Sequence, residues 1–371
     1  MNILIFFDGT ANEPNRGGQE PDAEGELGDS SITNVLKMHL CAGGLLIDEV
    51  PARDSGKIPG QLSIYLAGVG TRGNSILRRL RQAFAFSKPS QIRDKAIQKL
   101  EAVYEKGDRL FVFGFSRGAA IARKFCVQIG ETGVRTRSGE LDPSPIVELL
   151  GAWDTVAALG ASRSLLDRGV EPGTDELLED GPIAPIIRRG LHLVALDEER
   201  LAFRPTLMNA EPRVREVWFP GVHSDIGGGF RVAGLSDITL DYMLRAGREL
   251  GLDFLDFDAK PETFTGVDQN GREVSIGREQ LAIRPDPTAT LHSQDRGAMA
   301  SRVTLGARQV FVLRDDEPST TDLPLIHESV AQRIRALADY RPAPLRDLPH
   351  LVTDGDGNSR RAEGLADHLP E

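Results

Sequence analysis

Apolar runs alternate with amphipathic segments along the first two thirds of the chain. Uninterrupted apolar runs of strand length predict buried strands at residues 3–7, 61–67, 110–115, 146–152 and 214–219. Between them, apolar side chains recur at helical spacing over residues 31–41 and 91–104, and the small residues after 116 are typical of another helix. Strands that alternate with helices pair in parallel through crossover connections. The pattern therefore predicts a doubly wound, mostly parallel α/β sheet with loop insertions.

The pattern is weaker in the rest of the chain. Ser30 or Ser31 is the expected N-cap of the first helix. Further expected features are loops at 11–30 and 160–190, a small hairpin or cap at 258–296, a strand at 310–312 and a helix at 329–338. We therefore divide the chain into a core at 1–250, a C-terminal cap at 251–352 that completes the same domain, and a polar, mobile tail at 353–371.

The strand that ends at Phe115 runs into a motif that carries chemistry. Gly114-Phe115-Ser116-Arg117-Gly118 has the Gly-x-Ser-x-Gly spacing of a nucleophile elbow, in which a strand turns sharply into a helix and holds a serine hydroxyl above the sheet of a modified α/β-hydrolase fold. Gly114 and Gly118 leave room where the two backbones crowd each other. The alternative is a strand–turn–helix with an incidental serine. The strand before the motif and the small residues after it favour Ser116 as the nucleophile.

A serine nucleophile needs a base and a carboxylate that orients the base. Asp154 and His223 each follow an apolar run, at the strand ends where α/β sheets carry their reactive groups. Capping a helix that starts at Thr155 is the alternative role of Asp154. His327 is the competing base, although its position favours capping the helix that follows it. If Asp154 is not the acid, Asp225 or Asp197 takes that role.

Two loops are candidates for supporting roles. Asp225 lies in the glycine-rich segment after His223 and has three open roles: to support the ring of His223, to hold the loop, or to bind a cation. Asp8-Gly9-Thr10 follows the first strand, where hydrolases place an oxyanion donor. We expect the N–H of Arg117 and that of Gly9 or Thr10 to form the oxyanion hole. Asp8 then anchors this loop or pairs with Arg117.

Composition narrows the function class. The chain has 371 residues, of which 40% are hydrophobic and 27% charged, as in an ordinary soluble globular protein. Its formal net charge of −11 argues against nucleic acid as a partner. The locally cationic stretch at 71–81, which includes Arg78 and Arg79, is a candidate for transient contact with an anionic membrane surface. The two cysteines, Cys41 and Cys126, suggest no disulfide framework, and Cys126 is expected to be a buried thiol.

Targeting signals are not evident in the sequence. The chain opens directly with a strand, with no basic and apolar leader ahead of it, and no apolar run has the length of a transmembrane helix. We therefore expect cytoplasmic synthesis, with secretion by a route that needs no signal peptide as the alternative.

Several motifs, taken together and in order, resemble one family. They are Phe6-Phe7-Asp8-Gly9-Thr10, Ile32-Thr33-Asn34-Val35, Gly68-Val69-Gly70-Thr71, Gly114-Phe115-Ser116-Arg117-Gly118-Ala119, Trp153-Asp154-Thr155-Val156, Trp218-Phe219-Pro220-Gly221-Val222-His223-Ser224-Asp225-Ile226-Gly227-Gly228 and Ile326-His327-Glu328-Ser329-Val330. The chain resembles the α/β-hydrolase domain of the type VI secretion phospholipase effectors and its standalone relatives. The resemblance, which runs from residue 3 to about residue 345, implies a triad of Ser116, Asp154 and His223, phospholipid acyl esters as substrates, and an immunity or secretion partner.

These observations together predict a serine hydrolase that cleaves carboxylic esters, phospholipid or related lipid esters above all, through a Ser–His–Asp triad and an acyl-enzyme. No cofactor is expected. The first alternative is a metal-assisted hydrolase or phosphodiesterase that uses Asp8, Asp225 and His223. The second is a non-catalytic interaction domain.

Overall fold

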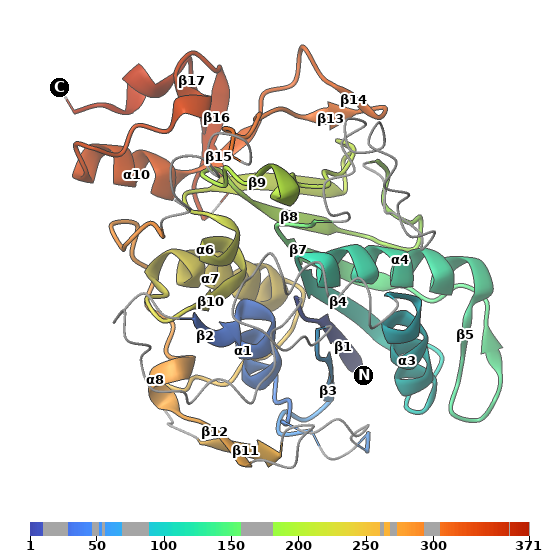
Figure 1. Ribbon diagram of the computed structural model, residues 1–371. Coiled ribbons are helices and arrows are strands. Elements are labelled where there is room, and N and C mark those ends of the chain that lie inside the picture. The colour runs from blue at the N-terminus through green and yellow to red at the C-terminus, as the bar shows by residue number, and fades with distance from the viewer. Residues whose placement is uncertain are drawn as a thin grey trace, which may run out of the picture.

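The computed structural model describes residues 1–9, 29–46, 52–53, 56–68, 89–156, 181–259, 263–267, 273–292, 305–355 and 357–370. These residues are built around one sheet of nine strands in the order β17-β16-β15-β9-β8-β7-β4-β1-β3 (Figure 1). The strands are β1 Asn2–Phe7, β3 Gln61–Leu66, β4 Arg109–Phe115, β7 Val147–Trp153, β8 Gly190–Ala195, β9 Val214–Phe219, β15 Leu325–His327, β16 His350–Thr353 and β17 Ser359–Ala362. Every neighbouring pair is parallel except β16 and β17.

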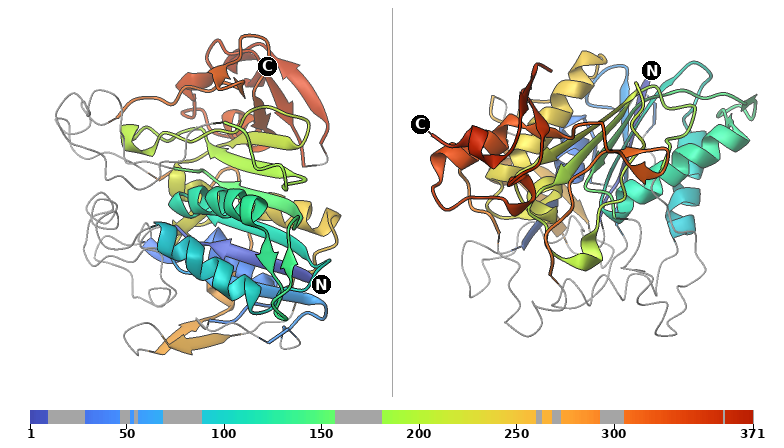
Figure 2. Two further views of the ribbon diagram at one scale, coloured as in Figure 1. Left: turned by 90° about the vertical axis from the view of Figure 1, so that its right-hand side faces the viewer. Right: turned by 90° about the horizontal axis from the view of Figure 1, so that it is seen from above.

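Helices cover both faces of the sheet (Figure 2). One face carries α3 (Pro89–Glu101) and α4 (Arg117–Thr132), and the other carries α1 (Asn34–Cys41), α6 (His223–Gly227) and α7 (Gly234–Glu249). The remaining helices are α8 Arg278–Leu281 and α10 Glu328–Ala336, with 3-10 turns η2 Leu201–Phe203, η3 Ala343–Leu345 and η4 Leu365–His368. This is the doubly wound, mostly parallel α/β class that the alternating pattern predicts.

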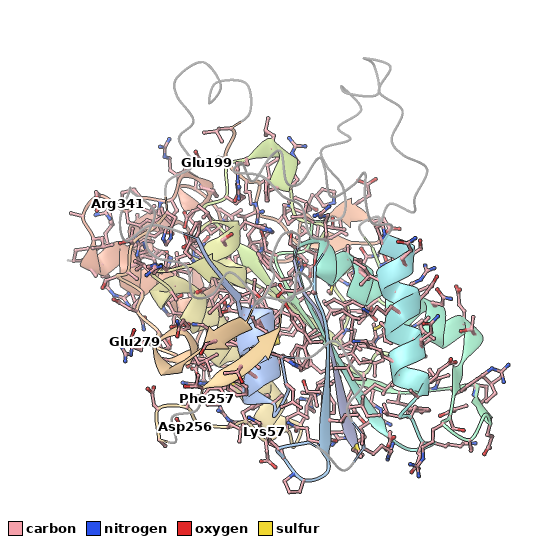
Figure 3. All side chains as sticks on the ribbon, turned by 60° about the horizontal axis from the view of Figure 1, so that its bottom comes forward. Lys57, Glu199, Asp256, Phe257, Glu279 and Arg341 are labelled. Carbon is pink, nitrogen blue, oxygen red and sulfur yellow. The ribbon has the colours of Figure 1, made fainter. Side chains whose placement is uncertain are left out.

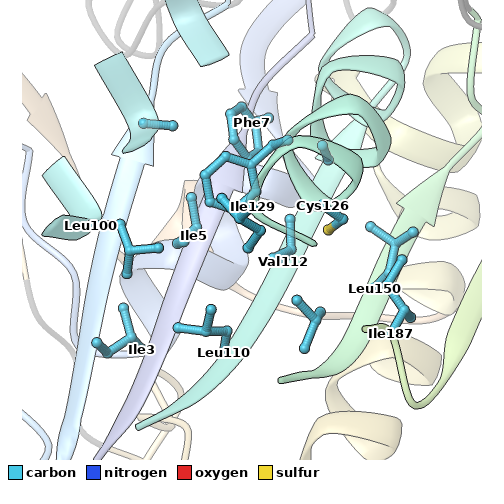
Figure 4. Packing of buried hydrophobic residues seen from close by; sticks show 14 of the residues in the cluster. Ile3, Ile5, Phe7, Leu100, Leu110, Val112, Cys126, Ile129, Leu150 and Ile187 are labelled. Atoms are coloured by element: carbon cyan, nitrogen blue, oxygen red, sulfur yellow. The ribbon is translucent and has the colours of Figure 1, made fainter. Parts of the chain in front are cut away.

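Alternate residues of the central strands enter the two layers of core. Figure 4 shows Ile3, Ile5 and Phe7 of β1 in one buried cluster with residues of α4, including Cys126. Leu4 and Phe6 of the same strand belong to a second cluster, on the opposite face. A strand that is buried on both sides has no polar alternation, which explains the uninterrupted apolar runs. Cys126 is a free, fully buried thiol, as expected.

Short strand pairs form separate two-stranded sheets outside the central sheet. They are β2 Asp29–Thr33 with β10 Gly228–Phe230, β5 Val134–Arg135 with β6 Leu141–Asp142, β11 Phe264–Val267 with β12 Glu273–Ile276, and β13 Leu313–Arg314 with β14 Glu317–Pro318. The β11–β12 pair is the hairpin expected within 258–296. Phe264 packs edge-on against Phe257, and the ammonium of Lys57 lies 4.1 Å from the centre of the Phe264 ring. Figure 3 labels Phe257 and Lys57.

Most predicted elements are found within a few residues of their expected bounds. The expected strands at 3–7, 61–67, 110–115, 146–152 and 214–219 are β1, β3, β4, β7 and β9, and the helices expected at 91–104 and 329–338 are α3 and α10. Most of the loop at 11–30, part of the insertion at 160–190 and the whole cationic stretch at 71–81 lie outside the described residues.

Four expectations are wrong. The helix at 31–41 begins only at Asn34, since Thr33 and not Ser30 or Ser31 caps it by accepting the Leu36 N–H at 3.1 Å. The strand β8 was not expected. Residues 310–312 are not a strand, and the short strand β13 follows them. The prediction of a polar, mobile tail at 353–371 is also wrong, because β17 lies within these residues and pairs with β16 at the edge of the main sheet.

Among the described residues, no helix is both long enough and apolar enough to cross a bilayer.

Helix α4 approaches β1 so closely that only glycine fits at its second position. A Cβ atom built on Gly118 would lie 2.5 Å from the carbonyl oxygen of Asp8 and closer still to that of Phe7. We predict that Gly118→Ala lowers the free energy of unfolding by roughly 1–3 kcal/mol, because the backbones must separate. Urea unfolding followed by circular dichroism measures the change.

Gly277→Ala is the matched control, since a Cβ atom at Gly277 would meet its nearest neighbour, the side chain of Gln280, at an ordinary 3.5 Å. This substitution is expected to change stability by less than about 0.5 kcal/mol. Equal stability of the two variants would contradict the close approach of α4 to β1.

Candidate active site

The candidate residues gather at the point where the order of the strands reverses. The chain passes from β1 outward to β3, and then returns to β4 on the other side of β1 before continuing to β7, β8 and β9. Such a switch point leaves a crevice at the carboxyl ends of the strands, where α/β proteins bind their ligands. Asp8 follows β1, Ser116 follows β4, Asp154 follows β7, and His223 follows β9 by a short turn.

Ser116 has the strained backbone of a nucleophile elbow. Its φ of 58° and ψ of −123° lie outside the regions that non-glycine residues ordinarily adopt. Its N–H donates to the carbonyl oxygen of Trp153 at 3.0 Å, and its own carbonyl oxygen accepts the N–H of Val156 at 3.2 Å. The strand-to-helix turn is therefore bonded to both sides of Asp154, and the strain is held by its surroundings.

Gly114 confirms the role expected of the motif glycines. A Cβ atom at Gly114 would lie 2.7 Å from the backbone N and Cα of Ala119, one turn into α4. Together with the approach of Gly118 to β1, this spacing shows that both glycines permit the sharp turn at Ser116.

The Asp154 carboxylate is completely buried and fully hydrogen-bonded. Its Oδ2 accepts from Nδ1 of His223 at 2.6 Å and from Nη2 of Arg308 at 2.9 Å. Its Oδ1 accepts from Nη1 of Arg308 at 2.6 Å and from the N–H of Ala195 at 3.0 Å. The φ of Asp154 is 39°, a further strained position at a strand end. Among the described residues, the Asp154 side chain makes these four hydrogen bonds and caps no helix.

The His223 imidazole is held by contacts on several sides. Its ring lies 4.6 Å from the ring of Phe115, the residue before Ser116, and 4.9 Å edge-on from that of Phe203. The backbone N–H of His223 donates to Oε2 of Glu198 at 3.1 Å. Because Nδ1 donates to the Asp154 carboxylate, Nε2 is the nitrogen that can accept a proton.

Burial and charge act in opposite directions on this pair. Burial by itself raises the pKa of Asp154, but the Arg308 guanidinium and the bonds from His223 and Arg308 hold that pKa well below its usual range. Burial lowers the pKa of His223 below its ordinary 6.5, although the Asp154 carboxylate opposes the shift. Near neutral pH the pair is therefore an imidazole beside a carboxylate, the state in which a histidine can act as a base.

The turn that holds Asp154 is supported from β8. The N–H of Thr155 donates to Nε2 of His192 at 3.0 Å, so Nδ1 of His192 carries the proton that it shares with Glu216 at 2.8 Å. His192 is fully buried and belongs to this structural chain of bonds.

The loop after β1 differs from the expectation in one respect. Asp8 Oδ1 accepts the N–H of Gly9 at 2.6 Å, and its Oδ2 accepts from the hydroxyls of Thr33 at 2.8 Å and Tyr65 at 2.5 Å. Asp8 therefore anchors the loop, as expected. The N–H of Gly9 is engaged by Asp8 and does not serve as an oxyanion donor in this state, while Thr10 lies outside the described residues. Arg117 opens α4, where a backbone N–H has no acceptor within the helix.

Asp225 and Asp197 do not contact the ring of His223. Asp225 accepts the N–H of Val222 at 3.1 Å and binds Nδ1 of His292 at 2.6 Å, so it holds the loop and does not support the His223 ring. Asp197 accepts the N–H of Gly221 at 2.7 Å and the hydroxyl of Tyr340 at 2.8 Å. Burial raises the pKa of Asp197 to about 6.

Asp8, Asp225 and His223 have different partners and do not converge on a metal site. Within the described part of the chain, no group of three His, Cys, Asp or Glu side chains has the arrangement to hold a metal ion. His327, the competing base, caps α10 by accepting the N–H of Ser329 at 3.2 Å.

With this geometry established, comparison with known proteins gives the family. The sequence model of the family described as "T6SS, Phospholipase effector Tle1-like, catalytic domain" matches residues 1–142 and 135–246, well over half of the chain. The chain belongs to this Tle1-like family. The match includes Ser116, Asp154 and His223.

The individual proteins that match this Tle1-like chain have low sequence identity to it or match only part of it. An uncharacterized protein of Saccharomyces cerevisiae is 30% identical over 152 residues, which are 38% of this chain and 19% of the yeast protein. The structure of an uncharacterized protein from Pseudomonas aeruginosa covers 70% of this chain and 47% of its own, at 21% identity and a TM-score of 0.44. The structure of the Tle1 effector bound to the VgrG spike of the Type 6 secretion system covers 62% and 51%, at 24% identity and a TM-score of 0.39. This chain thus spans about a fifth of the yeast protein and about half of each solved chain.

Sequence reasoning missed two residues of the candidate site. Arg308 forms a two-point ion pair with Asp154 from far along the chain, and no motif surrounds it. Glu198 is fully buried, binds Arg200 and accepts the His223 N–H. Glu198 follows β8, so recognising that strand from its apolar run would have marked this carboxylate as a strand-end candidate.

We predict that Arg308→Met destabilises the protein in a pH-dependent way. Removing one partner of a buried ion pair costs about 3–5 kcal/mol, and burial then raises the pKa of Asp154. In the wild type the lowered pKa contributes stability above about pH 4 that is lost as the pH falls. The free energy of unfolding of the variant therefore falls furthest below that of the wild type near pH 8. The difference shrinks toward pH 5, where Asp154 can take up a proton. Urea unfolding between pH 5 and 8 measures it.

Arg314→Met is the matched control, because Arg314 pairs with Asp322 on the surface. It should change stability little, with no such pH dependence, because solvent screens an exposed pair. A deficit for Arg308→Met that is small and constant with pH would show that Arg308 does not neutralise Asp154.

Proposed function

We propose that the chain is a serine hydrolase that cleaves carboxylic esters, with phospholipid acyl esters as the substrate class. One observation carries the proposal: Ser116 has elbow geometry at φ 58°, and the buried His223–Asp154 pair lies on the neighbouring strand ends. Membership of a family described by its phospholipase effectors supports the lipid substrate.

In the proposed reaction, Ser116 Oγ attacks the ester carbonyl while Nε2 of His223 takes its proton. The resulting imidazolium is stabilised by Asp154, which stays ionised. The alcohol leaves with the proton from His223, and an acyl group remains on Ser116. Water, activated by the same nitrogen, then releases the acid and restores the serine.

Charge that develops on the carbonyl oxygen needs N–H donors. The backbone N–H of Arg117 is suited to this role, because it opens α4 next to the nucleophile and lies at the positive end of the helix dipole. For the second donor we propose the loop after Asp8, with Thr10 in place of Gly9. Asp8 holds this loop through Thr33 and Tyr65.

Partners and location follow the same proposal. The substrate is a lipid or small ester met at a membrane surface, and the related Tle1 effector, which was solved bound to the VgrG spike, supports a secretion partner. An immunity partner and export without a signal peptide after cytoplasmic synthesis belong to the same hypothesis. The metal-assisted alternative loses support, because Asp8, Asp225 and His223 each bind a different partner.

We predict that Ser116→Ala abolishes labelling by a fluorophosphonate probe and lowers ester hydrolysis by about 10⁴-fold or more. His223→Ala and Asp154→Asn should also lose activity, because the serine is no longer deprotonated by a correctly oriented base. Intact-mass spectrometry counts the adducts, and circular dichroism confirms that each variant is folded.

Asp225→Asn and Asp197→Asn are the matched carboxylate controls, since neither side chain contacts the His223 ring. Both should keep the label wherever they remain folded. Ser138→Ala, at an exposed serine, should keep it fully. A folded wild type without an adduct would overturn the serine mechanism, and a labelled Asp154→Asn variant would move the acid role to another carboxylate.

The pH profile of the wild type should report the pKa of His223. Only the neutral imidazole is a base, and burial lowers its pKa below 6.5. We therefore expect kcat/KM to keep more than half of its plateau value at pH 6.5 and to fall by half only at a more acidic pH. A stopped assay with a soluble ester measures the profile, and an acidic midpoint above pH 7 would contradict the assignment of His223 as base.

A further inference from the structure

A pocket at the other end of the sheet is lined by arginine side chains. Its volume is about 540 Å³, and it lies between the start of β8 and β9 and the C-terminal half of α7. Its cationic lining consists of Arg188, Arg189, Arg213, Arg215 and Arg245, which we call the arginine pocket. Glu249 is the one carboxylate in the described lining.

Three of these arginines have carboxylate partners, and two do not. Arg188 pairs with Glu148, Arg213 with Glu211 and Arg245 with Asp241. Glu148 is also shared with Arg109. In the part of the chain that the structure describes, Arg189 and Arg215 form no ion pair.

Arg215 is the more constrained of these two. Its Nη2 donates to the Thr353 hydroxyl at 2.6 Å, while its Nε is buried and has no hydrogen-bond partner among the described residues. A buried charged donor without an acceptor is costly, and an anionic ligand would satisfy it. Arg189 is exposed at the mouth of the same pocket.

Two described glycines in the turn between β16 and β17 approach arginines of the pocket. A Cβ atom on Gly355 would lie 3.3 Å from Nη1 of Arg245, and one on Gly357 would lie 3.5 Å from Nη1 of Arg215. Asp354, in the same turn, binds the backbone N–H and side-chain amide of Asn358. Because glycine has no side chain, neither Gly355 nor Gly357 covers the Nη1 atom that it approaches.

The positive charge of the pocket affects the neighbouring His327. Burial lowers the pKa of His327 to about 3, and the charges of Arg215 and Arg245 add to the shift, although Asp354 opposes it. The field is local, since the whole chain carries a formal net charge of −11.

We propose that the arginine pocket binds a phosphate group. Guanidinium forks match phosphate oxygens in two-point hydrogen bonds, and all five cations that line the pocket are arginine, with no lysine. A free phosphate monoester and a lipid headgroup present the same chemistry.

This site is separate from the proposed hydrolytic site. The pocket opens at the amino ends of β8 and β9, whereas Ser116, Asp154 and His223 follow the carboxyl ends of their strands. A strand of six residues spans roughly 20 Å. A phosphate bound in the arginine pocket is therefore not part of the ester that meets Ser116, and its binding does not depend on the proposed function.

The test is calorimetric titration of the full chain with inorganic phosphate and with glycerol 3-phosphate, against sodium chloride of equal ionic strength. We expect saturable binding and a raised Tm. Arg189→Gln alone, at an exposed position that leaves the fold intact, should weaken binding about tenfold, as for loss of one charged hydrogen bond. Arg189→Gln with Arg215→Gln should abolish it.

The matched control removes two other surface charges. Arg137 and Arg361 are more than half exposed, pair with Glu105 and Glu363, and do not line the pocket. Arg137→Gln with Arg361→Gln should leave the affinity unchanged. Absence of phosphate binding by the wild type, or equal weakening in both double variants, would overturn the proposal.

Vesicle flotation distinguishes the two sources of phosphate. A Ser116→Ala background prevents hydrolysis during the assay. Vesicles of phosphatidic acid in phosphatidylcholine should retain the protein through Arg189 and Arg215 if the ligand is a lipid headgroup. Soluble phosphate binding that depends on these arginines, without vesicle binding, would identify a free phosphorylated ligand. A chain inactive on every ester but able to bind phosphate would refute only the proposed function.

Discussion

The buried carboxylate of Asp154 is the interaction on which the candidate site depends. It follows β7, yet its four hydrogen bonds reach the N–H of Ala195 at the end of β8, His223 after β9, and Arg308 in the segment that precedes β13. An ionised group with no solvent exposure is tolerated only when it is fully paired. The same bonds that satisfy this charge therefore fix the relative positions of four segments that are distant in sequence.

The close packing of the elbow has a similar effect on the other side of the site. Gly118 lets α4 approach the end of β1, and Gly114 lets the strand and helix backbones pass each other. The strain at Ser116 is then held by hydrogen bonds to Trp153 and Val156, which flank Asp154. Ser116 and Asp154 are thus coupled through the backbone, so that their relative position does not rely on flexible side chains.

The two ends of the sheet differ in how their charges are satisfied. At the carboxyl ends, Asp154, Glu198 and Asp225 each have partners within the described protein. At the amino ends, Arg189 and the buried Nε of Arg215 have no carboxylate partner among the residues that the structure describes. Carboxylates that are paired within the protein keep the candidate active site in a fixed geometry. An arginine without a carboxylate partner can instead bind an anionic ligand.

The sequence by itself determined strands β1, β3, β4, β7 and β9 of the central sheet, the strand-to-helix turn at Ser116, and Asp154 and His223 as strand-end groups. Local pattern carries this information because a strand buried on both faces must be apolar throughout, and a sharp turn needs glycine. Only the tertiary structure decided that Arg308 and not a neighbouring residue neutralises Asp154, that Asp225 binds His292, and that Asp8 engages Gly9. It also placed β17 in the sheet, although its polar residues resemble a tail. These contacts join segments up to 154 residues apart, and a long-range pair of charges leaves no periodic trace in either segment.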